Sequence, residues 1–183
     1  MIRWFAWALA GVLLGGIVHL ATVLLLPTMA MRDAYARLEP LTETNRMTLL
    51  PQPAPQGSAL PFLDPAFATA VCRYDLTSAP LKLQVTVTAA YTSLSFFTRR
   101  GVGYYAINDR AAARRVIELD LMTPEQRSHV QEDEEVTAAD RLIVESPTTT
   151  GLILVRALAP EPSAIPIVRG VLASAQCRSQ PQQ

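Results

Sequence analysis

The stretch "LKLQVTVT", residues 81–88, decides the fold class of this chain. Apolar and polar side chains alternate in it without a break, the apolar set being Leu81, Leu83, Val85 and Val87. Successive side chains of a β-strand point to opposite faces of a sheet, so a period of two is typical of a strand with one buried and one solvated face. Residues 81–88 are therefore predicted to form a strand against a hydrophobic core.

Five segments with strand-like composition follow this one. They are residues 91–98, 103–109, 116–121, 141–146 and 151–158, separated by turn-forming residues such as Asn108-Asp109. Residues 152–155 are apolar on both faces, so we expect the last strand to lie in the middle of a sheet. Six short strands with polar turns predict a mainly-β domain, either an antiparallel sandwich or a partly closed barrel.

Peripheral helices are predicted at three places. Asp64 and Pro65 are residue types of an N-cap and a first helical position, which favours one or two helical turns in residues 64–72. Thr123 and Pro124 give the same signal for residues 123–130. Ser163 is the expected cap of a C-terminal helix, and the apolar stripe predicted for that helix is Val168, Val171, Leu172 and Ala175.

The N-terminal segment predicts a transmembrane helix. From Trp4 to Leu26, 23 residues include no Asp, Glu, Lys or Arg. A helix of this length rises about 34 Å, enough to cross a hydrocarbon core of about 30 Å. Trp4 and Trp7 are suited to the membrane interface. The apolar run exceeds the core of a cleaved signal peptide, and "PTMAMRDA" after it is a poor cleavage site, so we expect residues 1–27 to be an uncleaved signal anchor.

Small and polar residues share one face of this predicted span. Gly11, Gly15 and His19 follow one another at intervals of four, and Thr22 comes three residues later. Glycines at this spacing let a second helix approach closely, and a polar group can then bond across the contact, which predicts a helix-pairing face. In the alternative interpretation, His19 is a neutral imidazole that an ordinary span tolerates. The span contains no second ionisable side chain for a proton relay.

The rest of the chain divides into four predicted regions. Residues 28–46 are expected to form a short amphipathic helix with Met31, Tyr35 and Leu38 on one face, limited by Pro40. Residues 47–63 include the proline-rich "PQPAPQGSALP" and are predicted to be an extended linker. The β-rich domain is expected to occupy residues 64–178, followed by a disordered tail at residues 179–183.

Composition argues against several functions. The 16 basic and 16 acidic residues balance, so no global field favours nucleic acid. His129 is the only histidine outside the predicted span, and no set of His, Cys, Asp and Glu has metal-ligand spacing, so we expect no metal and no cofactor. No nucleophile elbow accompanies His129. Residues 131–140, "QEDEEVTAAD", lack the pattern of a calcium loop, and the pairs Arg99-Arg100 and Arg114-Arg115 are interpreted as solvated.

Three stretches together resemble the bacterial family catalogued as domain of unknown function 1254. They are "YDLTSAPLKLQV" (74–85), "AYTSLSFFTRRGVGYYAIND" (90–109) and "VESPTTTGLILVRAL" (144–158), and the matching residues are Tyr74, Asp75, Ser146, Pro147, Thr148 and Arg156. The resemblance implies an exported, β-rich domain of unknown activity. That family's domain often accompanies a second one, number 1214, for which this sequence shows no counterpart.

Two functions follow as hypotheses. The first is a single-pass protein of the bacterial inner membrane whose periplasmic β-domain binds or assembles with a partner, such as a membrane protein that carries the missing companion domain. The alternative is a periplasmic enzyme that acts on a small ligand in a pocket lined by Tyr74, Asp75 and Arg156. The positive-inside rule disagrees with both, because Arg32, Arg37 and Arg46 follow the span while only Arg3 precedes it.

The two cysteines provide a test of this topology. Cys72 comes just before the first predicted strand, and Cys177 lies at the end of the C-terminal helix. In an oxidising compartment such a pair is a candidate disulfide, whereas in the cytoplasm both thiols stay reduced. We predict a Cys72–Cys177 bond that ties the last helix to the start of the sheet. The alternative is two buried free thiols.

Overall fold

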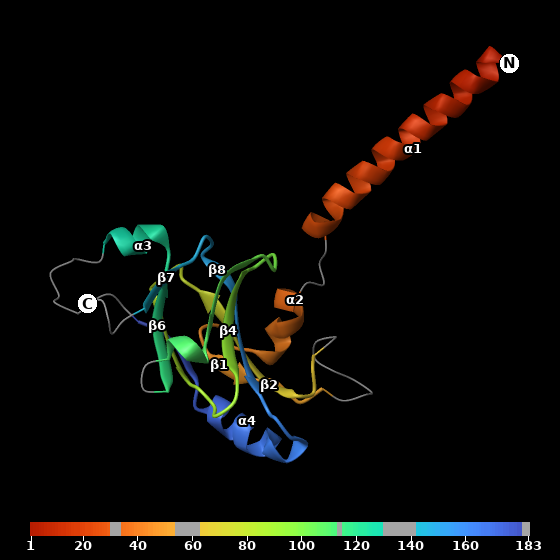
Figure 1. The fold of residues 1–183 in the computed structure, drawn as a ribbon. Helices are drawn as coiled ribbons and strands as arrows, with labels where there is room; N and C mark the ends of the chain where they lie inside the picture. The colour runs from red at the N-terminus through yellow and green to blue at the C-terminus, as the bar shows by residue number, and fades with distance from the viewer. Residues whose placement is uncertain (30–33, 54–62, 113–114, 130–141, 181–183) are drawn as a thin grey trace. The chain divides into compact units, whose positions relative to one another are not determined.

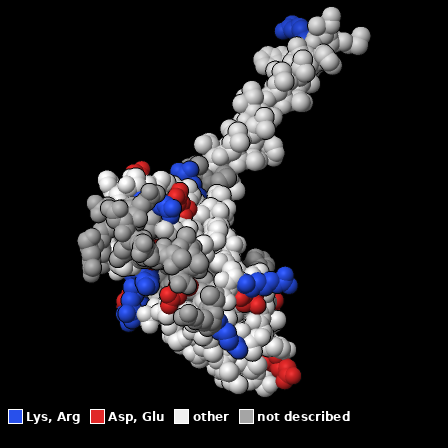
Figure 2. Space-filling model, turned by 60° about the vertical axis from the view of Figure 1, so that its left-hand side comes forward, with Lys and Arg blue, Asp and Glu red and all other residues white. Residues whose placement is uncertain are grey.

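The computed structural model describes residues 1–29, 34–53, 63–112, 115–129 and 142–180. The chain divides into two compact units, Met1–Asp33 and Ala34–Gln183. The first contains helix α1 (Ile2–Met29), of which Ile2–Leu26 is long and apolar enough to be a candidate membrane span. Figure 2 shows this helix white along its length apart from a basic side chain near its N-terminus. The predicted apolar helix is thus confirmed.

The second unit contains two sheets (Figure 1). The first has the order β1 (Met47–Leu49), β2 (Phe67–Asp75), β8 (Thr150–Leu158), β4 (Thr92–Thr98) and β5 (Gly103–Asn108), with every pair antiparallel. The second has the order β7 (Leu142–Glu145), β6 (Val116–Met122), β3 (Leu81–Thr86) and β9 (Gln176–Ser179). Its β6–β7 pair is parallel, so the second sheet is not purely antiparallel. Within the described residues the sheets do not close into a barrel, which confirms the mainly-β, two-sheet alternative.

The hydrophobic core lies between the two sheets. Alternate residues of β2 and β3 enter it, among them Cys72, Tyr74, Leu81, Leu83 and Val85. The alternation in residues 81–88 therefore marks the buried face as predicted. Strand β8 lies between β2 and β4, as expected for a strand with two apolar faces. Its second face is covered as well, because Leu152 belongs to a smaller cluster that includes Leu38 of helix α2 (Ala34–Leu38).

Short helices surround the sheets. α3 (Pro124–Ser128) begins as predicted, because Thr123 is its N-cap and forms a capping box with Gln126. α4 (Ile165–Ala173) buries Val168 and Leu172 but has no side-chain cap, and the Ser163 hydroxyl instead donates to the Glu161 carboxylate. The three 3-10 turns are η1 (Glu39–Leu41), η2 (Asp109–Ala111) and η3 (Pro162–Ala164).

Several predicted boundaries differ from the structure. The predicted helical turns in 64–72 are wrong, because the Asp64 carboxylate caps only a turn at Ala66 before β2 begins. β2 pairs with β8 along its whole length, so sheet pairing outweighs the local cap signal. Cys177 lies in β9 rather than in α4, and β9 extends to Ser179.

The folded unit also begins earlier than expected. Leu38 and Leu50 are buried, and residues 47–49 form β1, so these parts of the predicted juxtamembrane helix and linker belong to the domain. Residues 54–62 of the linker, the whole acidic segment 131–140, and Arg114 lie outside the described residues.

Candidate functional site

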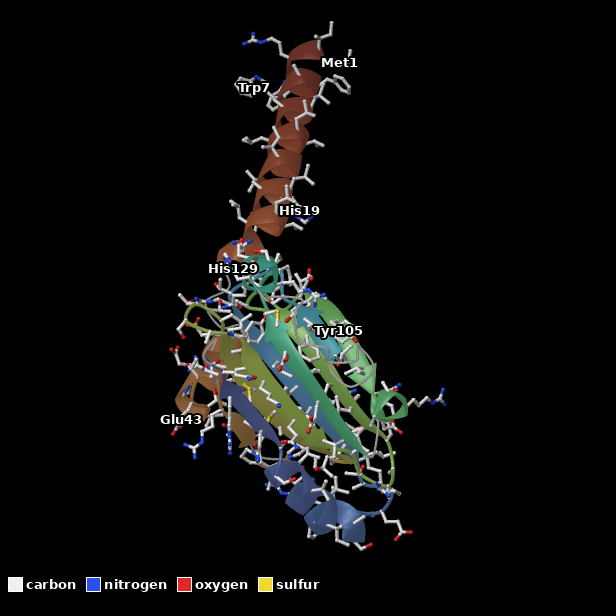
Figure 3. All side chains as sticks on the ribbon, turned by 90° about the vertical axis from the view of Figure 1, so that its left-hand side faces the viewer. Met1, Trp7, His19, Glu43, Tyr105 and His129 are labelled. Carbon is white, nitrogen blue, oxygen red and sulfur yellow. A yellow bond between two sulfur atoms is a disulfide. The ribbon has the colours of Figure 1, made fainter. Side chains whose placement is uncertain are left out.

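An open groove of about 750 Å³ lies between free edges of the two sheets. One wall is formed by residues 43–47, which lead into β1, and the other by residues 173–179, at the end of α4 and in β9. β1 is an edge strand of the first sheet and β9 an edge strand of the second. Figure 3 shows Glu43 at this edge of the domain. The groove is therefore placed by sheet topology rather than by one local motif.

Asn45 holds the two walls together at one end of the groove. Its backbone has a φ of 58°, a left-handed conformation that asparagine tolerates better than most residues. Its side-chain amide donates to the Asp75 carbonyl over 2.8 Å and to the Ser179 hydroxyl over 2.7 Å. Its side-chain oxygen accepts from the Asp75 backbone N–H over 2.7 Å. One side chain thus connects the segment before β1 with β2 and β9.

A disulfide pins the base of the groove. Cys72 of β2 and Cys177 of β9 are bonded, with their Cα atoms 6.5 Å apart, which confirms the predicted pairing. Both residues are buried, and Cys177 also lines the groove. Cys72 is the register partner of Met47 in β1. The bond therefore ties β2, the neighbour of edge strand β1, to edge strand β9 of the other sheet, rather than a helix to a strand.

The groove surface is polar and solvent-exposed. The Glu43 carboxylate accepts a hydrogen bond from Arg46 over 2.7 Å, which raises the pKa of that guanidinium, and both side chains are more than two-thirds exposed. Arg178 and Ser179 are exposed on the opposite wall. Among the described residues no cluster of three His, Cys, Asp or Glu could hold a metal ion. These features suit binding of a polar chain rather than an enclosed small ligand.

A second polar cluster lies between the sheets, with Tyr74 and Ser146 buried and Tyr104 partly buried. The Tyr74 hydroxyl lies 3.0 Å from the Tyr104 hydroxyl and 3.0 Å from the Ser146 hydroxyl. The Ser146 hydroxyl also donates to the Thr148 carbonyl over 2.6 Å. A Cβ at Gly151, the register partner of Tyr74, would overlap the Tyr74 ring, so the close approach requires glycine. Tyr74, Tyr104 and Ser146 come one from each of the three stretches that carry the family resemblance.

Tyr104 is a member of this cluster that the sequence did not single out. Burial raises the pKa of Tyr104 well above the ordinary tyrosine value, although the Ser146 hydroxyl opposes the shift. The hydroxyl therefore stays protonated at neutral pH, and the cluster acts as a polar contact between sheets. The Tyr104-Tyr105 pair was visible in the sequence, but only the strand pairing shows which ring meets Tyr74.

The structure does not bring Tyr74, Asp75 and Arg156 into one pocket. Tyr74 is buried between the sheets. The Asp75 carboxylate caps the following turn, where hydrogen bonds from the Thr77 hydroxyl and backbone N–H lower its pKa. Arg156 is exposed and pairs in register with Thr69, five residues along β2 from Tyr74, and its guanidinium lies 5.0 Å from the Phe67 ring centre. These three side chains therefore do not line one pocket.

The remaining predicted residues lie apart from the groove. Gly11 and Gly15 have open space around them in α1, and the Thr22 hydroxyl donates to the Val18 carbonyl over 2.8 Å. His19 is exposed on the same helix (Figure 3), and helix pairing through this face stays a prediction. His129 is exposed at the end of α3, with no metal cluster around it among the described residues.

Fold and groove together define a class: a two-sheet β-domain that follows a candidate membrane span. No protein-family model matches the chain, and neither does any curated protein. Among solved structures, the chain is similar to the VPA0106 protein from Vibrio parahaemolyticus, with a TM-score of 0.56 and 12% identity over 81% of this chain and 36% of that one. A putative uncharacterised protein from Burkholderia cenocepacia gives a TM-score of 0.47 at 12% identity, over 79% of this chain and 36% of that one. The similarity to the Vibrio parahaemolyticus protein shows a shared fold alone.

Proposed function

We propose that this chain is a single-pass membrane protein whose β-domain binds a partner protein on the periplasmic side of a bacterial inner membrane. The observation that carries the proposal is the groove between β1 and β9, which is open, polar and braced by Asn45 and a disulfide. A rigid surface loses little conformational freedom on binding, which favours affinity.

The backbone of the groove walls favours a protein partner. Leu50 donates to Thr69 on β2, and Gln180 donates to the carbonyl of Pro80 next to β3. Because antiparallel strands bond through alternate residues, the backbone groups of Met47 and Cys177 point away from their own sheets. Free sheet edges of this kind recognise extended peptide segments through main-chain hydrogen bonds.

The disulfide supports the periplasmic location. Structural disulfides persist in oxidising compartments and are rare in the cytoplasm. The arginine count after the span favours the opposite orientation, but it is a statistical bias on insertion, whereas a disulfide forms and persists only where the compartment is oxidising. An N-terminal apolar helix and a buried disulfide are the expected combination for a signal anchor followed by an exported domain.

The family resemblance and the structural comparison support the choice of partner. We propose membership of the family of domain of unknown function 1254, because the matching residues Tyr74 and Ser146 meet in one buried cluster. The chain spans 36% of the Vibrio parahaemolyticus protein, so a related fold occurs there as part of a longer chain. The proposed partner is a membrane protein that carries the companion domain.

Site-specific photo-crosslinking in cells tests this function. A photoreactive amino acid at Arg46 or at Arg178, one on each groove wall, is expected to capture the same partner. Arg110, exposed beside the distant edge strand β5, is the control position and is expected to capture none. Ser174→Trp, which fills the groove, is expected to abolish both adducts. Equal capture from Arg110, or capture that survives Ser174→Trp, would overturn the proposal.

A further inference from the structure

The β4–β5 turn presents positive charge and an apolar side chain together. Arg99 and Arg100 are exposed, and Val102 is 62% exposed. The turn is well defined, because the Thr98 backbone donates to the Val102 carbonyl over 2.9 Å and Val102 donates to the Thr98 hydroxyl over 3.2 Å. A fixed basic turn with an apolar tip has the chemistry of a membrane-interface contact.

This turn is coupled to α2. The Arg99 guanidinium lies 5.1 Å from the centre of the Tyr35 ring, and the guanidinium of Arg73 lies 5.1 Å from the same centre. Arg73 is nearly buried, and its Nη1 atom lies 3.7 Å from the Glu39 carboxylate. Cation–π contacts of this kind attach the Tyr35 ring to both arginines. The turn and α2 therefore form one surface of the domain.

The charge of this surface is positive. Arg99 and Arg100 are both exposed on it, and the acidic residue of the adjoining η1, Glu39, is paired with Arg73. Only residues 30–33 separate α1 from α2 in the sequence. A tether this short keeps α2 within reach of whatever surface holds α1.

We propose that Arg99, Arg100 and Val102 form a surface that contacts the anionic phospholipid headgroups of the membrane in which α1 is anchored. The inference rests on the membrane anchoring in the proposed function and is independent of the groove. Each arginine near an anionic membrane surface strengthens binding to that membrane by about fivefold. This attraction acts within about one Debye length, roughly 8 Å, so the short tether is essential. Val102 enters the interfacial region, and the arginines bind phosphate groups around it.

The test uses the full chain in lipid nanodiscs with a photoreactive amino acid at Val102. Lipid adducts, counted by mass spectrometry, are expected in discs that contain phosphatidylglycerol and to fall several-fold in discs of phosphatidylcholine alone. Arg99→Gln with Arg100→Gln is expected to lower the adducts to the level of the neutral discs. Lys82→Gln with Arg115→Gln removes the same charge from β3 and from the turn before β6, and it is expected to leave the adducts unchanged.

A second photoreactive position separates contact from chance collision. Ile167 of α4 is 73% exposed and apolar, but it lies beyond the opposite end of β8, since Thr98 pairs with Gly151 and Thr92 with Ala157. Adducts at Ile167 equal to those at Val102, or adducts that ignore lipid charge, would overturn the inference.

Two further outcomes distinguish the possible causes of failure. Loss of adducts with inorganic phosphate, but not with chloride at equal ionic strength, would identify a site for free phosphate and overturn the lipid assignment. Failure of the full chain to enter nanodiscs overturns the anchor and this inference together. Incorporation without adducts at Val102 overturns this inference alone and leaves the groove proposal intact.

Discussion

Single residues in the buried hydroxyl cluster explain why the matching sequence stretches contain tyrosine, serine and glycine. Tyr74 reaches across the core from one sheet to Ser146, which follows edge strand β7 of the other. Glycine is the only residue type at position 151 that leaves room for the Tyr74 ring. A buried hydroxyl without a partner costs about 1–3 kcal/mol, so each member requires the others. The cluster is a stability device that also specifies how the sheets align.

Tyr104→Phe is expected to change how stability depends on alkaline pH. The pKa of Tyr104 in the folded protein lies above the ordinary value of 10.0. Below pH 10.0 the protonated hydroxyl therefore makes its full contribution to the free energy of unfolding. As pH rises from there toward the folded pKa, the unfolded state ionises first and stability is lost. The variant lacks this component. Urea unfolding from about pH 8 to about pH 11 measures it, and an equal slope in both proteins would contradict the assignment.

At the scale of elements, helix α2 illustrates how packing stabilises a segment that is too short to fold alone. A five-residue helix is unstable in isolation because nucleation is costly. Leu38 is fully buried in a cluster with Leu50, Val71 and Leu152 on the outer face of the first sheet. The Thr42 hydroxyl donates to the Leu38 carbonyl over 2.8 Å and closes the end of the helix. Packing of Leu38 therefore holds residues 34–38 on the first sheet.

Leu38→Ala is expected to release α2 from the sheet. Truncation of a buried leucine costs about 2–5 kcal/mol, because it removes apolar contact and leaves a cavity. Hydrogen exchange should show faster exchange in residues 34–41, and urea unfolding should show lower stability. Leu41→Ala is the matched control, since Leu41 is 44% exposed and its truncation should cost much less. Equal effects of the two substitutions would mean that Leu38 does not hold α2.

For the whole molecule, the disulfide matters because it closes a long segment of chain. Cys72 and Cys177 are 105 residues apart, and the bond joins β2 of the first sheet to edge strand β9 of the second. A cross-link of this span restricts the unfolded chain more than the folded one. The chain-entropy argument gives a contribution of about 4–5 kcal/mol. The bond also fixes the width of the groove.

The double substitution Cys72→Ala with Cys177→Ala is expected to lower the free energy of unfolding by about 4–5 kcal/mol at most. Reductant should destabilise the wild-type domain toward the variant and leave the variant itself unchanged. In cells, alkylation of the denatured protein without reductant should label neither cysteine, and prior reduction should expose both. Full labelling without reduction would remove the chemical support for a periplasmic domain.

The sequence by itself determined the features that arise from local periodicity and composition. The alternation in residues 81–88 identified a buried strand face, the run Leu152–Val155 identified a central strand, and the uncharged N-terminal segment identified a candidate span. The cap at Thr123 was also local, because all its partners lie within one helical turn. The Cys72–Cys177 pairing could be predicted because the sequence contains only these two cysteines.

Only the tertiary structure decided which distant segments meet. The cap signal at Asp64 predicted a helix, but pairing with β8 makes residues 67–75 a strand. The resemblance pointed to Tyr74, Asp75 and Arg156, yet strand register separates Arg156 from the other two and brings Tyr104 to Tyr74 instead. The groove exists because β1 and β9, which lie far apart in the sequence, end up at adjoining sheet edges. Periodicity fixes which face of a strand is buried, but hydrogen bonds between strands choose its neighbours, and those bonds depend on the whole chain.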